Sequence, residues 1–195
     1  MYTEVKSASG IALVPIETRH LSKRRVYLRG EITMELAEEL DNQLALLNDA
    51  STTAPIDLFI SSPGGELDAM MYIYDMITAP ECAPIRAHGQ GVVASAAALI
   101  FAACPFRDLL PGTRMMIHQP LIANSVKGNC TDIHAVSRNL LSARDKMEHL
   151  LAKHTGQTIQ VIRKKTAQGD CWFSADEAVA FGLADKVSTY GEMLN

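Results

Sequence analysis

Apolar residues along the chain recur with two alternating periods, one typical of strands and one typical of helices. Short apolar stretches at 25–30 and 56–60 predict strands. Between them, Leu36, Leu40 and Leu44 recur at helical spacing behind Thr33, a residue that can cap a helix. Strands that alternate with helices predict an α/β fold built from βαβ units. Further strands are expected over 85–93, 107–110 and 114–118, and further helices over 66–77, 94–103, 131–155, 158–166 and 174–182.

Residues 1–22 are mixed and polar, and we expect them to form an N-terminal arm. Residues 23–195 contain no linker, repeat or low-complexity tract, so a single domain is expected there. The glycine- and proline-rich stretch 61–65 is expected to be a turn. The helix over 131–155 would be about 37 Å long at ~1.5 Å per residue. A helix of that length in a small protein is typical of one that projects toward a partner.

Composition and charge narrow the class of protein. The 195 residues are 48% hydrophobic and 21% charged, as in an ordinary globular chain. The 18 basic and 22 acidic residues give a formal charge of −4, which argues against nucleic-acid binding. No apolar run approaches the roughly 18 residues that cross a bilayer. The N-terminus has no signal pattern. We therefore expect a cytoplasmic protein without a membrane or nucleic-acid partner.

The cysteines and histidines do not predict a metal or cofactor site. The four cysteines are widely spaced and form no CxxC pair, so reduced thiols are expected. The histidines show no HExxH spacing. A Walker-type or GxGxxG loop is also lacking, which disfavours a nucleotide enzyme.

Ser95 and His118 are the first candidates for chemistry. Ser95 lies between a predicted strand and an apolar helix, where free backbone N–H groups favour a developing negative charge. His118 ends an apolar strand, the usual position of ligand-binding groups in parallel sheets. A nucleophilic serine needs a base, and histidine is the usual one. Taken alone, each residue more often has a structural role, Ser95 as a helix cap or small packing residue and His118 as a partly buried, hydrogen-bonded histidine.

Two further parts of such a site are less specific. Gly64 and Gly65 follow a predicted strand and could offer backbone N–H groups to an oxyanion or a substrate backbone. An aspartate should orient the imidazole. Spacing alone does not choose among the candidates, which are Asp68, Asp75, Asp108, Asp132, Asp170, Asp176 and Asp185.

Taken together, these segments resemble the proteolytic subunit of the Clp protease (ClpP), a family of serine peptidases. The resemblance covers about 25–187, and its motifs are SPGG, GVVASAAA, MIHQP, HTGQ and a final stretch, GDCWFSADEAVAFGLADKV. Ser95 precedes His118 by 23 residues, and His118 precedes Asp170 by 52. The resemblance implies a ClpP/crotonase-like fold. It also implies that the 131–155 helix is the projecting handle that joins two rings.

The resemblance also assigns roles. Ser95 matches the family nucleophile, His118 the general base and Asp170 the orienting carboxylate. Gly65 and Ala96 match the oxyanion hole. The residues expected to bind the substrate are Gly64, Glu66, Leu67, Gln119 and Pro120.

The resemblance further implies partners and an assembly. Family members form heptameric rings stacked as a 14-mer, which degrade unfolded polypeptides delivered by an AAA+ unfoldase such as ClpX or ClpA. The arm at 1–22 would then lie at the axial entrance. No cofactor is implied.

Several positions depart from the family pattern. Val92, Val93, Ala96 and Ala97 replace residues around the family nucleophile. The family has two aromatic residues in this strand, near the place where unfoldase loops dock. Here Asp57 occupies the first of these positions and Phe59 the second. Gln168-Gly169 replaces a charged pair that helps to join rings. The segment before the first strand lacks the usual helix-forming stretch, so no helix is expected there.

These departures leave other functions open. One alternative is a regulatory or weakly active ring subunit that needs a paralogous ClpP partner. Another is a phage-type head-maturation peptidase or a signal-peptide peptidase. A crotonase-type enzyme acting on acyl-CoA would share the fold, but the serine, histidine and aspartate argue against it.

Overall fold

Seven strands pair into one mostly parallel sheet in the computed structural model, which describes residues 1–7, 10–122 and 125–194. The strands are β3 (Arg25–Ile32), β4 (Ile56–Gly65), β5 (Ile85–Ala94), β6 (Phe106–Leu109), β7 (Arg114–Ile117), β8 (Cys171–Ser174) and β9 (Lys186–Val187). The order is β3-β4-β5-β6-β9, and β7 pairs with both β5 and β8. Only the β7–β8 pair is antiparallel.

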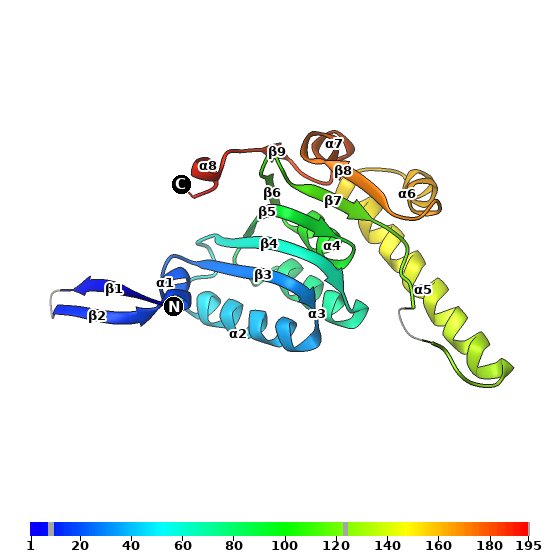
Figure 1. Ribbon diagram of the computed structural model, residues 1–195, viewed down its shortest axis with the longest axis horizontal. Coiled ribbons are helices and arrows are strands. Elements are labelled where there is room, and N and C mark those ends of the chain that lie inside the picture. Colours follow the sequence, from blue (N-terminus) through cyan, green and yellow to red (C-terminus); the bar gives the residue numbers. More distant parts are fainter. Residues whose placement is uncertain (8–9, 123–124, 195) are drawn as a thin grey trace.

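Helices cover one face of this sheet (Figure 1). They are α2 (Met34–Ala50), α3 (Leu67–Thr78) and α4 (Ala96–Ala103), and the remaining helices of the domain are α5 (Cys130–Thr155), α6 (Ile159–Thr166), α7 (Ala175–Phe181) and α8 (Tyr190–Met193). Strand side chains alternate between the two faces. Val26, Leu58 and Ala87 therefore face the helices in the core, while Tyr27 and His88 belong to the other face. This arrangement confirms the α/β class.

Helices α2 and α7 begin where local sequence signals predict them. The Thr33 hydroxyl accepts from the Leu36 N–H at the start of α2. Ser174 and Glu177 form a capping box at the start of α7. Leu40, Leu44 and Leu47 form the buried face of α2. The all-apolar α4 is buried along its whole length, as its sequence predicts.

The long helix α5 is confirmed, with a capping box at Asn129 and a left-handed C-cap at Gly156. Its C-terminal half packs on the domain through Met147 and Leu151, which are buried. Its N-terminal half runs away from the sheet (Figure 1). Ile133 and Leu141 are exposed there, each with a relative exposure of 47%.

The N-terminal residues form a hairpin and a short helix. The hairpin strands are β1 (Tyr2–Ser7) and β2 (Gly10–Pro15), and α1 (Ile16–Leu21) follows directly. The expectation of no helix before the first sheet strand is therefore wrong. Pro15 takes the N-cap position with φ −54, which suits entry into a helix. The hairpin extends from the end of the molecule opposite to α5 (Figure 1).

The expected turn at 61–65 is also wrong, because β4 continues through Gly65. The register with β3 shifts between Arg29 and Glu31 and then resumes with Ile32 opposite Gly65. Helix α4 begins at Ala96, two residues later than its apolar run predicts. The strands β8 and β9 and the helix α8 were not predicted, because segments of two to four residues carry little periodic signal. Among the described residues, no helix is long and apolar enough to span a membrane.

Candidate active site

Ser95 and His118 meet because their strands are neighbours in the sheet. Strands β5 and β7 are parallel, with Ala94 opposite Met116. Ser95 directly follows β5, and His118 directly follows β7. The Ser95 backbone N–H donates to the Met116 carbonyl at 2.8 Å, which fixes the two strand ends together. Parallel strands end at the same edge of a sheet, so both side chains lie at that edge.

Ser95 has an unusual backbone conformation. Its φ is 55 and its ψ is −121, at the junction between β5 and α4. Positive φ is uncommon for residues other than glycine and costs roughly 1–3 kcal/mol. A serine on a sharp, strained turn between a strand and a helix presents its hydroxyl at the top of the sheet. No residue pattern in the sequence signalled this strain.

The Ser95 hydroxyl and the His118 ring are in hydrogen-bonding contact. The Ser95 Oγ lies 2.6 Å from His118 Nε2. The His118 side chain is 15% exposed, so the ring is largely protected from solvent. This is the geometry that a nucleophile and its base require.

Asp170 lies on the other side of the ring, at a looser distance. Its Oδ1 is 3.5 Å from His118 Nδ1, longer than a usual hydrogen bond, and its side chain is 56% exposed. The pairing of β8 with β7 explains this position. Ile117 is opposite Cys171, so the residues next to them, His118 and Asp170, become neighbours.

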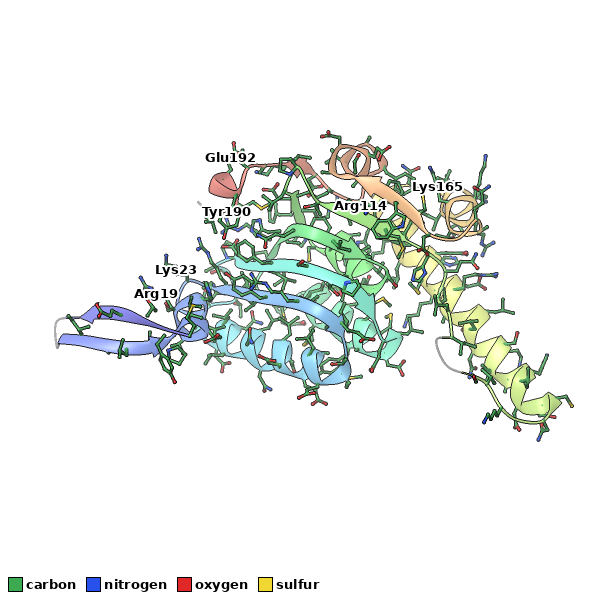
Figure 2. All side chains as sticks on the ribbon, in the orientation of Figure 1. Arg19, Lys23, Arg114, Lys165, Tyr190 and Glu192 are labelled. Atoms are coloured by element: carbon green, nitrogen blue, oxygen red, sulfur yellow. The ribbon has the colours of Figure 1, made fainter. Side chains whose placement is uncertain are left out.

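A cation–π contact links these two strands. The Arg114 guanidinium of β7 lies 4.3 Å from the centre of the Trp172 ring of β8. Arg114 projects beside β8 in Figure 2. The strand that brings Asp170 to the site is therefore attached to β7 by side chains as well as by its backbone ladder.

Gly64 and Gly65 allow β4 to approach its neighbours closely. A Cβ on Gly64 would lie 2.7 Å from the Ser95 Cβ and 2.9 Å from the Ala94 carbonyl oxygen. A Cβ on Gly65 would lie 2.1 Å from the Ile32 carbonyl oxygen. Both positions therefore exclude any side chain. The φ of Gly64 is +101, which also favours glycine.

Gly65 and Ala96, the predicted backbone donors, line the same cavity as Ser95. The Glu66 N–H donates to the Ile32 carbonyl on the β3 side. Successive N–H groups of a strand point to opposite sides, so the Gly65 N–H points toward the β5 side. Ala96 is the first residue of α4, where N–H groups have no partner within the helix.

A cavity of about 470 Å³ surrounds the hydroxyl and the ring. Its lining includes five of the predicted residues besides Ser95 and His118. The predicted residues that line it are Gly65, Glu66, Leu67, Ser95, Ala96, His118 and Pro120. Gly64 is packed beneath residues 94–96, and neither Gln119 nor Asp170 borders this cavity.

Three methionines that the sequence analysis did not single out also line the cavity. Met70 comes from α3, Met116 from β7 and Met147 from α5. All three are largely buried. Unbranched thioether side chains adapt to irregular apolar partners. No local sequence pattern indicates that they converge, because their convergence depends on how three separate elements pack.

This arrangement is suited to acyl transfer rather than to metal chemistry. It combines a serine hydroxyl in contact with an imidazole and a cavity that holds both. Within the described ranges, no group of three or more histidine, cysteine, aspartate or glutamate side chains is placed to hold a metal ion.

Comparisons with known proteins agree with the resemblance. The model of the Clp protease family matches residues 9–191. The ATP-dependent Clp protease proteolytic subunit 2 of Treponema denticola is 39% identical over 172 residues, covering 87% of this chain and 84% of that protein. The protein of the same name from Gluconobacter oxydans is 38% identical over 175 residues, covering 88% and 77%. The chain therefore belongs to the Clp protease family.

Proposed function

We propose that this chain is the peptidase subunit of a Clp-type protease and cuts polypeptides through Ser95, His118 and Asp170. The observation that carries the proposal is the 2.6 Å contact between Ser95 Oγ and His118 Nε2. The family membership supports the same reaction class.

In the first half of the reaction, Ser95 Oγ attacks the peptide carbonyl carbon while His118 Nε2 takes the hydroxyl proton. The Gly65 and Ala96 N–H groups donate to the oxygen that becomes negative. Each such donor is worth about 3 kcal/mol of barrier in comparable enzymes. His118 then gives its proton to the departing amine, and an acyl-enzyme remains.

In the second half, His118 takes a proton from water, and the resulting hydroxide equivalent attacks the acyl carbon. The ester bond to Ser95 breaks, and Oγ recovers the proton from His118. Asp170 would hold the ring tautomer in which Nδ1 carries a proton and would stabilise the imidazolium. The distance of 3.5 Å between Asp170 Oδ1 and His118 Nδ1 must shorten before Asp170 can contribute fully to catalysis.

The cavity indicates which side chains a substrate presents. Met70, Met116 and Met147 offer an adaptable apolar lining beside Ser95. Residues 63–67, with Gly64, Glu66 and Leu67, offer an edge along which an extended peptide can add as a strand. Gln119 and Pro120 would border the same peptide. We expect cleavage after large, unbranched apolar residues of unfolded polypeptides.

The projecting half of α5 supports assembly into rings that stack in pairs. Ile133 and Leu141 are exposed on it, and Leu121 and Ile122 are exposed in the segment that precedes it. Apolar side chains on a projecting element are typical of an interface. We propose seven-membered rings, stacked as a 14-mer that encloses the sites, with α5 as the handle between them.

The same proposal includes an AAA+ unfoldase such as ClpX or ClpA, and the arm 1–22 at the axial entrance. The arm extends away from the sheet, which supports this position (Figure 1). Asp57 departs from the aromatic pattern of the family docking region. It is buried and paired with Arg86 and His88.

One observation favours a second candidate function. Asp170 is exposed and lies 3.5 Å from His118 Nδ1. Such an arrangement is also expected in a ring subunit whose site becomes active only when a paralogous subunit is its neighbour. In that case the isolated chain would assemble but cleave weakly.

Native mass measurement combined with a fluorogenic apolar peptide tests both candidates. The main proposal predicts a 14-mer that cleaves the peptide, and a Ser95→Ala 14-mer that does not. A 14-mer without activity in the wild-type chain, restored by a paralogue, would support the second candidate instead. A monomer that cleaves nothing under any of these conditions would contradict both.

A further inference from the structure

The cavity at Ser95 has an acidic wall that the proposed reaction does not use. Glu31 of β3 and Glu66, which directly follows β4, both line this cavity. Glu66 belongs to the residues that the sequence analysis singled out, whereas Glu31 does not. Among the described residues, the lining contains no lysine or arginine. Two negative charges therefore border the nucleophile without a compensating basic side chain.

Strand pairing places Glu31 close to Ser95. The register between β3 and β4 shifts after Arg29, and Glu31 lies opposite Gly64 as a result. Gly64 lies directly against Ser95, because a Cβ on Gly64 would be 2.7 Å from the Ser95 Cβ. Paired strands are roughly 4.8 Å apart. One strand spacing thus separates Glu31 from the glycine that touches the nucleophile.

Glu66 lies on the same wall of the cavity as Glu31. The Glu66 N–H donates to the Ile32 carbonyl at 2.8 Å, which attaches the residue to β3. Its backbone is extended, with φ −66 and ψ 137, and it lies two residues beyond Gly64. One strand spacing and two extended residues put the Cα atoms of Glu31 and Glu66 about 8 Å apart. Glutamate side chains at this separation can contact one substrate cation between them.

Both carboxylates are available to a substrate. Neither makes a hydrogen bond or an ion pair within the part of the chain that the structure describes. Both residues are exposed. Arg29, two residues before Glu31 on the same strand, instead places its guanidinium 4.2 Å from the centre of the Tyr27 ring. The acidic wall of Glu31 and Glu66 is therefore not neutralised by the chain itself.

The other side of the cavity is apolar. Met70, Met116, Met147 and Leu121 line it there. A peptide whose apolar side chain occupies the methionine side brings the neighbouring side chains of the peptide near the acidic wall. Opposite charges attract and like charges repel at such short range. The wall therefore discriminates between basic and acidic neighbours of the apolar residue.

We propose that Glu31 and Glu66 select polypeptides that carry a lysine or arginine within two residues of the apolar residue bound at Ser95. This inference rests on the proposed function, because it names the substrate class of the same site. The two carboxylates contact the substrate and take no part in proton transfer.

The test compares acetyl-Ala-Lys-Met-Lys-Ala-amide with a control peptide in which norleucine, which lacks the charge, replaces both lysines. Lysine on both sides of the methionine makes the result independent of the direction in which the peptide lies. Binding is measured by isothermal titration calorimetry on the full chain with Ser95→Ala, which leaves the peptides intact. We expect the lysine peptide to bind at least about fivefold more tightly than the control. Raising the salt from about 0.1 M to about 1 M shortens the Debye length from ~10 Å to ~3 Å and should remove most of this preference.

Variants of the acidic wall make the test specific. The double substitution Glu31→Gln and Glu66→Gln should reduce the preference to within about twofold, and Glu31→Gln alone should give an intermediate value. Glu35→Gln, an exposed glutamate in the first turn of α2, is the matched control and should keep the full preference. Glu31→Lys should favour acetyl-Ala-Glu-Met-Glu-Ala-amide over the lysine peptide. Damage to the fold weakens the binding of every peptide and does not reverse a preference.

The outcomes separate this inference from the proposed function. Equal binding of the lysine and norleucine peptides, no saturable binding of either, or a preference that survives the double substitution would overturn the inference. Cleavage of the same peptides by the wild-type chain, followed by mass spectrometry, tests the proposed function separately. Preferential binding without cleavage would support the acidic wall and contradict the proposed peptidase activity. Cleavage of both peptides with equal affinities would do the reverse.

Discussion

Asp170 Oδ1 lies 3.5 Å from His118 Nδ1, while the opposite nitrogen of the same ring lies 2.6 Å from Ser95 Oγ. The ring is thus tightly engaged on the side of the nucleophile and loosely on the side of the carboxylate. If the assembled protein tightens the second contact, activity and assembly are coupled through Asp170.

Asp170→Asn is expected to lower kcat by about 10²–10⁴-fold with KM nearly unchanged, because the amide no longer holds the ring in the productive tautomer. Steady-state kinetics on an apolar peptide measure this. Asp176→Asn, an exposed aspartate in the first turn of α7, is the control and should retain activity. A kcat within twofold of wild type in Asp170→Asn would rule out the orienting role.

Gly64→Ala is expected to reduce both stability and activity. The new Cβ would lie 2.7 Å from the Ser95 Cβ at a φ of +101, so either Ser95 or β4 must shift. We expect a loss of at least about 2 kcal/mol in the free energy of unfolding. Denaturant titration measures it.

Gly112→Ala is the matched control, because nothing lies within 4 Å of its added Cβ and its φ is not positive. Its effect should stay within about 0.5 kcal/mol. Equal effects of the two substitutions would show that the close approach of β4 to Ser95 does not constrain the site.

Acidification is expected to loosen the attachment of α5 through His154. Burial, followed by the nearby charges of Lys153 and Arg107, lowers the pKa of His154 from 6.5. As the pH falls, His154 is therefore protonated at a higher pH in the unfolded chain than in the folded one. The contribution of His154 to stability is complete above pH 6.5 and is lost as the pH falls through the lower folded pKa.

Unfolding experiments between pH ~7.5 and ~5.5 measure this contribution. His154→Gln should flatten the decline in the free energy of unfolding, because it removes the titrating ring beside the Tyr74 hydroxyl. His149→Gln, on the exposed side of the same helix, should keep the wild-type slope. An unchanged slope in His154→Gln would contradict this prediction.

Leu141→Glu is expected to disrupt assembly without unfolding the chain. Leu141 is exposed on the projecting half of α5, and burial of a leucine side chain in an interface contributes about 1.5–3 kcal/mol. We therefore expect assembly at least about tenfold weaker by native mass or sedimentation.

Asn139→Glu adds the same charge on the opposite side of the helix and is the control. It should assemble like the wild-type chain. If both variants assemble normally, this face of α5 is not the interface.

The sequence predicted the helices and strands that have long, regular hydrophobic patterns. It missed the segments whose conformation depends on pairing with a distant strand. The helix at Leu40 and Leu44 and the long helix ending at Gly156 have strong periodicity and caps, and both are confirmed. Residues 61–65 read as a turn because their composition is turn-like. The pairing with β3 instead keeps them extended, and pairing is decided by distant residues.

The same limit applies to the site. The sequence singled out Ser95 and His118, and the structure brings them together. The choice of Asp170 among seven aspartates came from the family resemblance. The positive φ of Ser95 and the cavity position of Met147 depend on how β5, α4 and α5 pack, which no local pattern encodes.

Labelling with a fluorophosphonate probe, followed by peptide mapping, tests the central claim most directly. The account predicts one adduct on Ser95 in the wild-type chain, no adduct in Ser95→Ala, and labelling slowed at least about 100-fold in His118→Ala. Labelling that persists in Ser95→Ala, or that proceeds at an unchanged rate in His118→Ala, would contradict it.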